Sequence, residues 1–204
     1  MSDPAGDGTV LAKGVGAEAF GARAWPAKVQ LVDGAVVVDT PGPAHQEVAE
    51  RIFAALVTFT TGHAGRGVAG MGLEVAVSPN NVYTPDVWWV RDGRPDAAAR
   101  PVRLDAAPDI AVEVRSPATW RFDSGTKRRR YGEAGTAELW LVDHQAGKVI
   151  VHWRTEGSAA AGSAAAGSGS GGGFDATRTI PVGEILLSPL LPGFLLDLNL
   201  IFRP

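Results

Sequence analysis

The first strong hydrophobic pattern along the chain is VQLVDGAVVV, residues 29–38, in which two β-rich arms flank Asp33-Gly34. An Asp-Gly pair between apolar arms is typical of a tight hairpin turn. The following segment, PGPAHQEVAERIFAALVTF, begins with residues that favour a helix start. Its apolar positions recur at helical spacing on one face: Val48, Ile52, Leu56 and Phe59. The pattern therefore predicts a hairpin followed by an amphipathic helix that packs through this face.

The middle of the chain carries patterns typical of strands. GLEVAVS alternates like a half-exposed strand, and VYTPDVWWV, residues 82–90, resembles a strand buried on both faces from residue 87 onward. A polar loop, RDGRPDAAARPVR, separates it from PDIAVEVRSPATW, residues 108–120. The apolar residues of this last stretch predict a buried strand over 108–115.

The remaining patterns predict one more helix, a hairpin and a closing segment. FDSGTKRRRYGEAG is typical of a helix with Asp or Ser near its start and Gly135 as its stop. AELWLVDHQAGKVIVHW has two apolar arms around a polar turn, and SPLLPGFLLDLNLIF is apolar enough to close a core. The order β, β, α, β, β, β, α, β, β predicts one α/β domain with a mixed sheet and a helix on each side.

Two segments look unlike the rest of this domain. Residues 1–24 are rich in Gly and Ala without periodicity, so we expect them to be loosely ordered. Residues 157–173, GSAAAGSAAAGSGSGGG, have too low a complexity to bury anything. Because only about thirty residues follow, we expect a flexible loop between two strands instead of a linker between domains. The domain itself then spans residues 25–204.

Composition supports a soluble globular protein. The chain has 204 residues, 45% hydrophobic and 20% charged, and no apolar run long enough to span a membrane. The N-terminus lacks the pattern of a signal peptide, and the absence of cysteine fits a cytoplasmic location. The net charge is −3, yet residues 91–130 hold ten Lys/Arg against six Asp/Glu. Such a basic segment could meet a polyanion such as nucleic acid, or could simply be a solvated face.

Several types of enzyme site are absent from the sequence. There is no G-x-S-x-G nucleophile motif and no G-x-x-x-x-G-K-[ST] phosphate loop. The four histidines lie far apart, without the spacing of zinc ligands: His45, His63, His144 and His152. The remaining candidates are a set of acids and one basic helix.

The acid that most needs an explanation is Glu113, in the middle of the buried strand. Burying a carboxylate costs several kcal/mol unless something compensates it. Asp109 points to the same face but lies about 13 Å away along the strand, at about 3.3 Å per residue. Asp86 belongs to another strand, and neighbouring strands lie about 4.8 Å apart. If the two strands pair in a suitable register, Asp86 and Glu113 converge and make a site suited to Mg²⁺.

The arrangement of Pro-Asp on one strand and acid-x-basic on the next resembles the PD-(D/E)XK nuclease superfamily. More closely, the chain resembles the Uma-type family of bacterial restriction endonucleases. The matching pieces run in the family's order from about residue 29 to the end: LVDGAVV, HQEVAERIFAAL, YTPDVWWV, PDIAVEVRSPATWRFDSGTKRRRYGEAGTAELWLVD and SPLLPGF. The resemblance implies a restriction-endonuclease-like core, with a mixed central sheet flanked by helices and additional hairpins.

The resemblance also implies roles for particular residues. Asp86 and Glu113 match the two acidic metal ligands, for Mg²⁺ or Mn²⁺. The superfamily has Lys two residues after the second acid, and here Arg115 stands at that position. In the Uma-type family the basic role corresponds to Lys127 on the following helix, with Tyr131 as its neighbour one turn later. Arg115 would then serve as a phosphate contact, because Arg stays protonated whereas the pKa of Lys can drop on desolvation.

Each role has a simpler alternative. Glu113 could be satisfied by Arg115 or a backbone amide, Asp86 could cap a turn, and Lys127 could face water. Asp109 and Glu47 are further candidates for the site, although turn chemistry and ordinary helix exposure explain them as well. His45 could make a polar contact at a helix end, and the Trp88–Trp89 pair is more typical of a core than of base stacking.

The favoured function is a divalent-metal-dependent DNA endonuclease. The alternative is a nucleic-acid-binding or regulatory protein that keeps the fold without cutting, which Arg115 and the acidic net charge favour. A carboxylate-rich domain without a nucleic-acid role is the third reading. No membrane association is expected, and cleavage of both strands would suit a symmetric homodimer.

Overall fold

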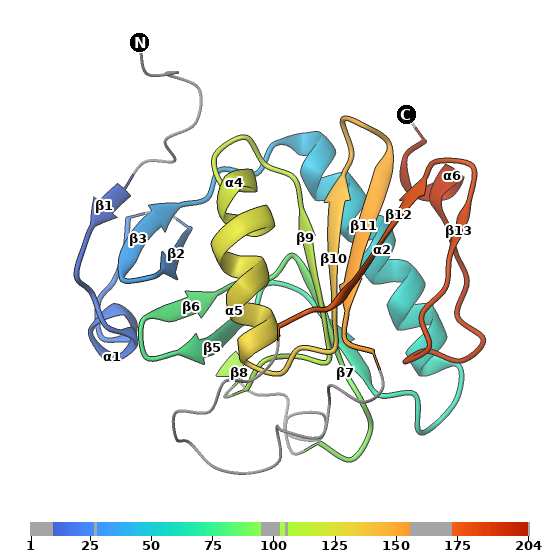
Figure 1. The fold of residues 1–204 in the computed structure, drawn as a ribbon, viewed down its shortest axis with the longest axis horizontal. Coiled ribbons are helices and arrows are strands. Elements are labelled where there is room, and N and C mark those ends of the chain that lie inside the picture. The colour runs from blue at the N-terminus through green and yellow to red at the C-terminus, as the bar shows by residue number, and fades with distance from the viewer. Residues whose placement is uncertain (1–9, 27, 95–102, 105, 156–172, 204) are drawn as a thin grey trace.

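Two six-stranded sheets organise the chain, with a third, two-stranded sheet near the C-terminus (Figure 1). The computed structural model describes residues 10–26, 28–94, 103–104, 106–155 and 173–203. The flexible loop expected at 157–173 therefore lies almost wholly outside the described residues. The strands on either side of it, β11 and β12, pair with each other in antiparallel fashion.

The first sheet has the order β1-β3-β2-β6-β5-β8. Its strands are β1 (Val10–Ala12), β2 (Val29–Val32), β3 (Ala35–Val38), β5 (Glu74–Ser78), β6 (Asn81–Tyr83) and β8 (Arg103–Leu104). The hairpin predicted over 29–38 is confirmed as β2 and β3. Asp33 and Gly34 both have positive φ, 45° and 78°, as a two-residue hairpin turn of this kind requires.

The second sheet is the central one and has the order β12-β11-β10-β9-β7-β4. Its strands are β4 (Val68–Gly70), β7 (Val87–Val90), β9 (Ile110–Val114), β10 (Glu138–Asp143), β11 (Lys148–Trp153) and β12 (Ala176–Pro181). β9 and β10 run parallel, and the other neighbours run antiparallel, so the sheet is mixed as predicted. Every residue of β7, β9 and β10 is buried, which explains their continuous apolar runs.

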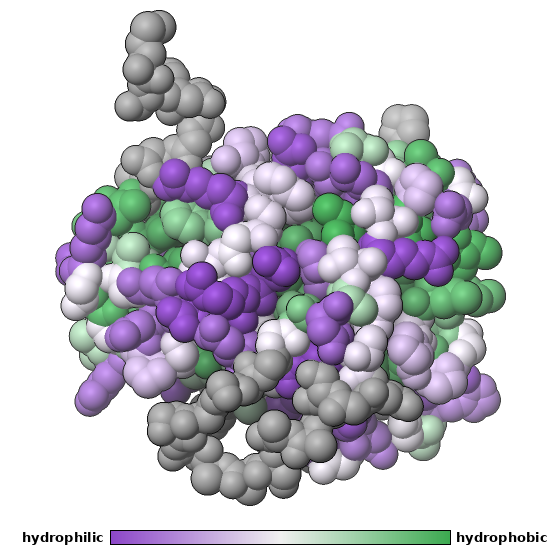
Figure 2. All heavy atoms as spheres, in the orientation of Figure 1, coloured by the Kyte–Doolittle hydropathy of each residue, from purple (hydrophilic) through white to green (hydrophobic). Residues whose placement is uncertain are grey.

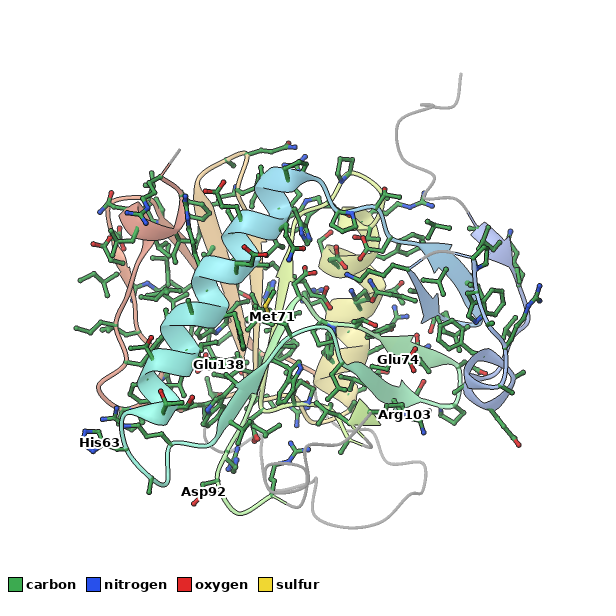
Figure 3. All side chains as sticks on the ribbon, turned by 180° about the vertical axis from the view of Figure 1, so that it is seen from behind. His63, Met71, Glu74, Asp92, Arg103 and Glu138 are labelled. Carbon is green, nitrogen blue, oxygen red and sulfur yellow. The ribbon has the colours of Figure 1, made fainter. Side chains whose placement is uncertain are left out.

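Helices cover both faces of the central sheet (Figures 1 and 3). α2 (Pro43–Thr61) lies on one face, and the continuous helix formed by α4 (Trp120–Phe122), η1 (Asp123–Lys127) and α5 (Arg128–Glu133) lies on the other. This second helix is the crossover between the parallel strands β9 and β10. The remaining elements are α1 (Ala17–Gly21), α6 (Leu198–Ile201), β13 (Ile185–Leu186) and β14 (Leu196–Asp197).

The amphipathic helix predicted after the hairpin is confirmed as α2. It begins with Pro43, whose fixed φ suits a first helical turn. Val48, Ile52 and Leu56 are buried in one core cluster with β-strand residues such as Trp140. Burying each aliphatic side chain contributes about 1.5–3 kcal/mol, so this face alone anchors the helix to the sheet.

The closing segment also joins this core, as its apolar composition predicted. Leu191, Phe194 and Ile201 are buried in the cluster that holds α2. The ring of Phe194 stacks on Trp140 with ring centroids 6.3 Å apart. The C-terminal residues therefore complete the core on the α2 side of the central sheet.

The structure differs from the sequence-based elements in three places. The strand expected over 82–90 is broken at Thr84–Asp86, where the chain leaves the first sheet through β6 and enters the central sheet as β7. The helix expected to start at Asp or Ser begins at Trp120 and contains a π-helical turn, although Gly135, at φ 98°, follows its end as predicted. Within the segment expected to be loosely ordered, the described residues form β1 and α1, and Phe20 of α1 is buried.

Candidate active site

Asp86 and Glu113 face each other across two adjacent strands. β7 pairs with β9 with Val87 opposite Val112, and one further step in this antiparallel register sets Asp86 opposite Glu113. Residues opposite one another in an antiparallel pair point to the same face. Both carboxylates are buried, with side chains 7% and 3% exposed. The structure therefore has the β7–β9 register that Asp86 and Glu113 need in order to converge.

One oxygen of Asp86 is held by its neighbours and the other is freer. The amide of Val114 donates to Oδ2 at 2.8 Å, and His45 Nε2 lies 3.1 Å from the same oxygen. Oδ1 faces the ammonium of Lys28 at 3.8 Å. The buried acid is thus oriented by α2 and β9, while its second oxygen has a longer contact, with Lys28.

Glu113 accepts two contacts on a single oxygen. The Nζ of Lys127 lies 2.7 Å from Oε1, and the hydroxyl of Tyr131 donates to Oε1 at 2.8 Å. The pKa of Glu113 is raised to about 8, because burial and the nearby charges of Asp123 and Asp86 outweigh the lowering effect of Lys127. An acid in this state gains stability from a bound proton or from an added cation.

Lys127 is a buried ammonium held between two acids. Its side chain is 1% exposed, and Nζ lies 2.8 Å from Asp123 Oδ1 in addition to its contact with Glu113. The ring of Tyr83 lies 5.3 Å away and adds a cation–π contact. Burial by itself lowers the pKa of Lys127, but Asp123 and Glu113 outweigh it and raise the pKa above its ordinary value. From the sequence, desolvation could have lowered this pKa, but the two flanking carboxylates raise it. Lys127 therefore stays protonated, so it can orient a neighbouring group but cannot act as a neutral base.

A π-helical turn places Asp123 beside Lys127. The two residues bound η1, and both are buried. Thr119 Oγ1 donates to Asp123 Oδ2 at 3.0 Å, and burial raises the pKa of Asp123 although Lys127 opposes the rise. Such turns are rare and occur often at functional sites. Sequence analysis missed Asp123; its spacing of four residues before Lys127 was the available signal.

Lys28 and Asp39 form a second acid–base pair beside Asp86, and sequence analysis missed both. The β2–β3 register has Val29 opposite Val38, so one step outward Lys28 stands opposite Asp39. Their side chains pair at 3.0 Å, and the amide of Asp39 donates to the Lys28 carbonyl at 2.9 Å. Counting outward from the Asp33-Gly34 turn would have found this pair.

Three of the further candidates lie outside this cluster. Arg115 pairs with Asp143 at 3.0 Å, on β10. Asp109 pairs with Arg91 at 2.6 Å, at the opposite end of β9 from Glu113. Glu47 is more than half exposed and pairs with Arg51 one helical turn later. Tyr131, by contrast, joins the cluster through Glu113.

Other polar and aromatic groups have structural partners. Trp89 is buried in the core and donates to the carbonyl of Arg66 at 2.8 Å. Glu138, labelled in Figure 3, is a further buried acid that the sequence analysis did not consider. It accepts from Trp140 and Ser188, both at 2.8 Å, and so it is satisfied within the α2 side of the sheet.

The cluster contains more acidic groups than basic ones. Asp39, Asp86, Glu113 and Asp123 are four carboxylates, whereas Lys28 and Lys127 supply two ammonium groups. Across the described residues, no three or more His, Asp or Glu side chains are arranged to hold a metal ion. Two facing carboxylates nevertheless suit Mg²⁺, which keeps several waters and uses few protein ligands. A divalent cation at Asp86 and Glu113 therefore fits both the donor set and the charge.

A mixed sheet covered by helices on both faces, with acids facing each other on adjacent strands and a lysine from the crossover helix, defines an α/β protein with a restriction-endonuclease-like core. The family model for Uma2, described as a putative restriction endonuclease, matches residues 21–167, and the chain belongs to this family.

The same fold is found in a solved structure. A crystal structure described as a putative nuclease belonging to DUF820 from Anabaena variabilis superposes with a TM-score of 0.72. It is 14% identical in sequence, and the match covers 92% of this chain and 97% of that one. A comparison with curated proteins gave no match. In the part of the chain that the structure describes, no helix has the length and apolarity needed to cross a membrane.

Proposed function

We propose that this protein is a divalent-metal-dependent endonuclease that hydrolyses DNA phosphodiester bonds. The observation that carries the proposal is the buried contact of Lys127 with Glu113 at 2.7 Å, directly across the strand pair from Asp86. Membership of a family described as a putative restriction endonuclease supports the reaction class. Asp86 and Glu113 would hold the cation, Mg²⁺ or Mn²⁺.

The residues of the cluster have distinct tasks in this reaction. When bound, the cation activates water and neutralises charge on the phosphate. Lys127 stays protonated and orients the water and the Glu113 carboxylate. Tyr131 fixes Glu113 Oε1, and Asp123 fixes the Lys127 ammonium. The water oxygen forms a bond to phosphorus and releases a proton to solvent. The bond to the leaving oxygen breaks in the same step, and that oxygen takes up a proton from solvent.

The surface over the crossover helix supports a nucleic-acid substrate. Figure 2 shows a hydrophilic band across the face that α4 and α5 present to the viewer in Figure 1. The crossover helix carries three consecutive basic residues, Arg128, Arg129 and Arg130, directly after Lys127. Arg129 and Arg130 pair with Asp33 and Glu133. Arg129 has 54% of its side chain exposed. Exposed arginines bind phosphate groups well.

A plasmid-cleavage assay tests the proposal. Supercoiled DNA is incubated with the protein in Mg²⁺, in Mn²⁺ and in EDTA, and wild type is compared with Asp86→Asn, Glu113→Gln and Lys127→Met. Cleavage should require a divalent cation and fall by at least about a hundredfold in each variant, because removing one catalytic group costs that much or more in comparable sites. Glu47→Gln, an exposed acid on α2, is the matched control and should keep its activity. Cleavage in EDTA, or equal activity of wild type and Glu113→Gln, would overturn the proposal.

A second candidate is a protein that binds nucleic acid without cutting it. The contacts of Arg115 favour it, because the residue at the usual lysine position is tied to Asp143 and does not reach Glu113. Isothermal calorimetry separates the two functions. A protein that takes up no Mg²⁺ or Mn²⁺ at millimolar concentration, yet still binds DNA, would support this second function.

We also propose that double-strand cleavage uses two copies of the chain. Each copy brings one acid pair, and a symmetric dimer would direct one pair to each strand. Analytical ultracentrifugation with and without duplex DNA tests this. A protein that stays monomeric on DNA while cutting both strands at once would contradict the dimer.

A further inference from the structure

Resting on the nuclease function above, we propose that Lys28 contacts the substrate phosphate at the open side of the acid pair. It is a second lysine of the site, with a task different from that of Lys127.

The backbone brings Lys28 to Asp86 through the first sheet. β2 pairs with β6 with Leu31 opposite Val82, so this register, extended outward, leads Lys28 toward Pro85. A hydrogen bond from the Thr84 amide to Gln30 Oε1, at 3.2 Å, fastens the same two segments together. The chain enters the central sheet directly after this point, which explains why the Lys28 ammonium reaches Asp86.

Exposure distinguishes Lys28 from the other groups that pair with the site acids. Its side chain is 40% exposed, against 5% for His45 and 1% for Lys127. Tyr131 is fully buried. Of these side chains, that of Lys28 is therefore the one that reaches solvent, where an arriving phosphate would meet it.

The contacts of Lys28 hold the ammonium in place and leave it able to take a further anion. Asp39 binds it at 3.0 Å, while Asp86 Oδ1 lies at the longer distance of 3.8 Å. An ammonium has three N–H donors, and these two acids do not use all of them at short distance. Burial of part of its side chain lowers the pKa of Lys28, but Asp39 and Asp86 outweigh this and keep the group charged.

Asp39 has the features of a tether for this lysine. Its side chain is 4% exposed, and its Oδ1 is buried without a hydrogen-bond partner among the described residues. The carboxylate therefore depends on Lys28 for compensation and keeps the ammonium at the rim. A cation held by Asp86 and Glu113 would weaken the attraction of Lys28 to Asp86, and Asp39 would keep the ammonium where an incoming phosphate could reach it.

The test measures DNA binding without cleavage. Anisotropy titrations of a fluorescein-labelled duplex are run in EDTA at several NaCl concentrations, and the slope of log K against log [NaCl] is determined. Lys28→Gln should reduce the slope by about 0.9, the value for one lost phosphate contact on duplex DNA. Lys28→Arg should restore the wild-type slope. Lys13→Gln, at another exposed lysine near β1, is the matched control and should leave the slope unchanged.

A second variant separates phosphate contact from simple pairing. Asp39→Asn removes the tether's charge but keeps Lys28, so DNA binding should be as tight as wild type or tighter. Weakening by Asp39→Asn equal to that by Lys28→Gln would show that the pair only supports the fold, and would overturn the inference. So would an unchanged slope in Lys28→Gln. A wild-type protein that binds no DNA would instead contradict the proposed function itself.

Discussion

Glu113 shows how a single buried carboxylate can depend on its surroundings. Its position in a fully buried strand carries a desolvation penalty of several kcal/mol. Lys127 and Tyr131 offset part of this penalty, but Asp123 and Asp86 add negative charge close by. The residue is thus compensated enough to fold and still able to attract a further cation. Under the proposed function, this is the state that Glu113 would need in order to hold a metal ion.

A pH-dependence follows from the raised pKa of Glu113. Its value is about 8 in the folded protein against an ordinary 4.5, so the folded state holds the proton more tightly than the unfolded state. The stability that this proton contributes is fully present below pH 4.5 and is lost as the pH rises toward 8. Glu113→Gln mimics the protonated acid and does not titrate. In EDTA, wild type should therefore lose free energy of unfolding relative to Glu113→Gln between pH 5 and 8, by at most about 1.4 kcal/mol per pH unit.

Urea unfolding at pH 5, 6, 7 and 8 measures this difference. Groups common to both proteins contribute to both curves, so their effects largely cancel when the two curves are subtracted. Glu47→Gln, a change at an exposed acid outside the cluster, is the control. A constant difference for Glu113→Gln would mean that the burial of its charge is already fully compensated.

The sequence could identify those site residues whose motifs depend on local spacing and order along the chain. Asp86, Glu113, Lys127 and Tyr131 could be named from motif order, and the structure brings all four together. The sequence could not decide the register that sets Asp86 opposite Glu113, because pairing between distant strands is not a local property. The pKa direction of Lys127 was also inaccessible, since it depends on Asp123.

At the scale of the elements, the crossover helix is the one with an unusual geometry. The hairpin at 29–38 and the helix at 43–61 follow directly from their hydrophobic patterns. The π-helical turn at Asp123–Lys127 has no comparable signature in the hydrophobic pattern. It adds a residue to one turn, so side chains on its two sides are rotated relative to their places in a continuous α-helix. The start of the helix and its π-helical turn could therefore not be predicted, although the i,i+4 spacing of Lys127 and Tyr131 could.

Two glycines give contrasting predictions for their elements. Gly125 lies in η1, and a Cβ there would meet no atom within 4 Å. Gly125→Ala should therefore raise the free energy of unfolding by about 0.5–1 kcal/mol, because alanine favours helix over glycine. At Gly70 on β4, a Cβ would lie 2.1 Å from the Trp88 ring. Gly70→Ala should lower the free energy of unfolding by about 1–3 kcal/mol or more through this overlap.

Urea denaturation of the two variants beside wild type is the measurement. Both changes add one methyl group, so each serves as the control for the other. A loss of stability in Gly125→Ala would show that the π-helical turn depends on glycine for a reason other than space.

At the scale of the whole molecule, two sheets meet at the site and neither contains it alone. The central sheet supplies Asp86 and Glu113, whereas the first sheet supplies Lys28 and Asp39. The two sheets join at Thr84–Asp86, a break within the segment that the sequence pattern predicted as one continuous strand. The mixed sheet and its covering helices could be predicted. The division into two sheets could not, since the local pattern of 82–90 does not show with which distant strands its two ends pair.

Stabilisation by divalent cations is a prediction for the whole fold. A ligand that binds only the folded state stabilises it by about 2.7 kcal/mol at a hundred times its Kd. Thermal unfolding of wild type should therefore shift upward in MgCl₂ relative to NaCl of equal ionic strength. Asp86→Asn should lose most of this shift, and Glu47→Gln should retain it. An equal shift in wild type and Asp86→Asn would place the cation elsewhere on the molecule.

The two-residue turn at Asp33-Gly34 has a consequence beyond the hairpin. Because the strands on either side of it pair residue by residue, the length of this surface turn determines whether Lys28 meets Asp39 at all. One inserted residue would shift the pairing of β2 and β3 by one position. Side chains that now lie opposite each other on one face of the sheet would then point to opposite faces. Relatives with a longer turn should therefore lack this pair or build it from other positions. The length of this surface turn should therefore indicate whether a family member has a lysine–acid pair beside the proposed site.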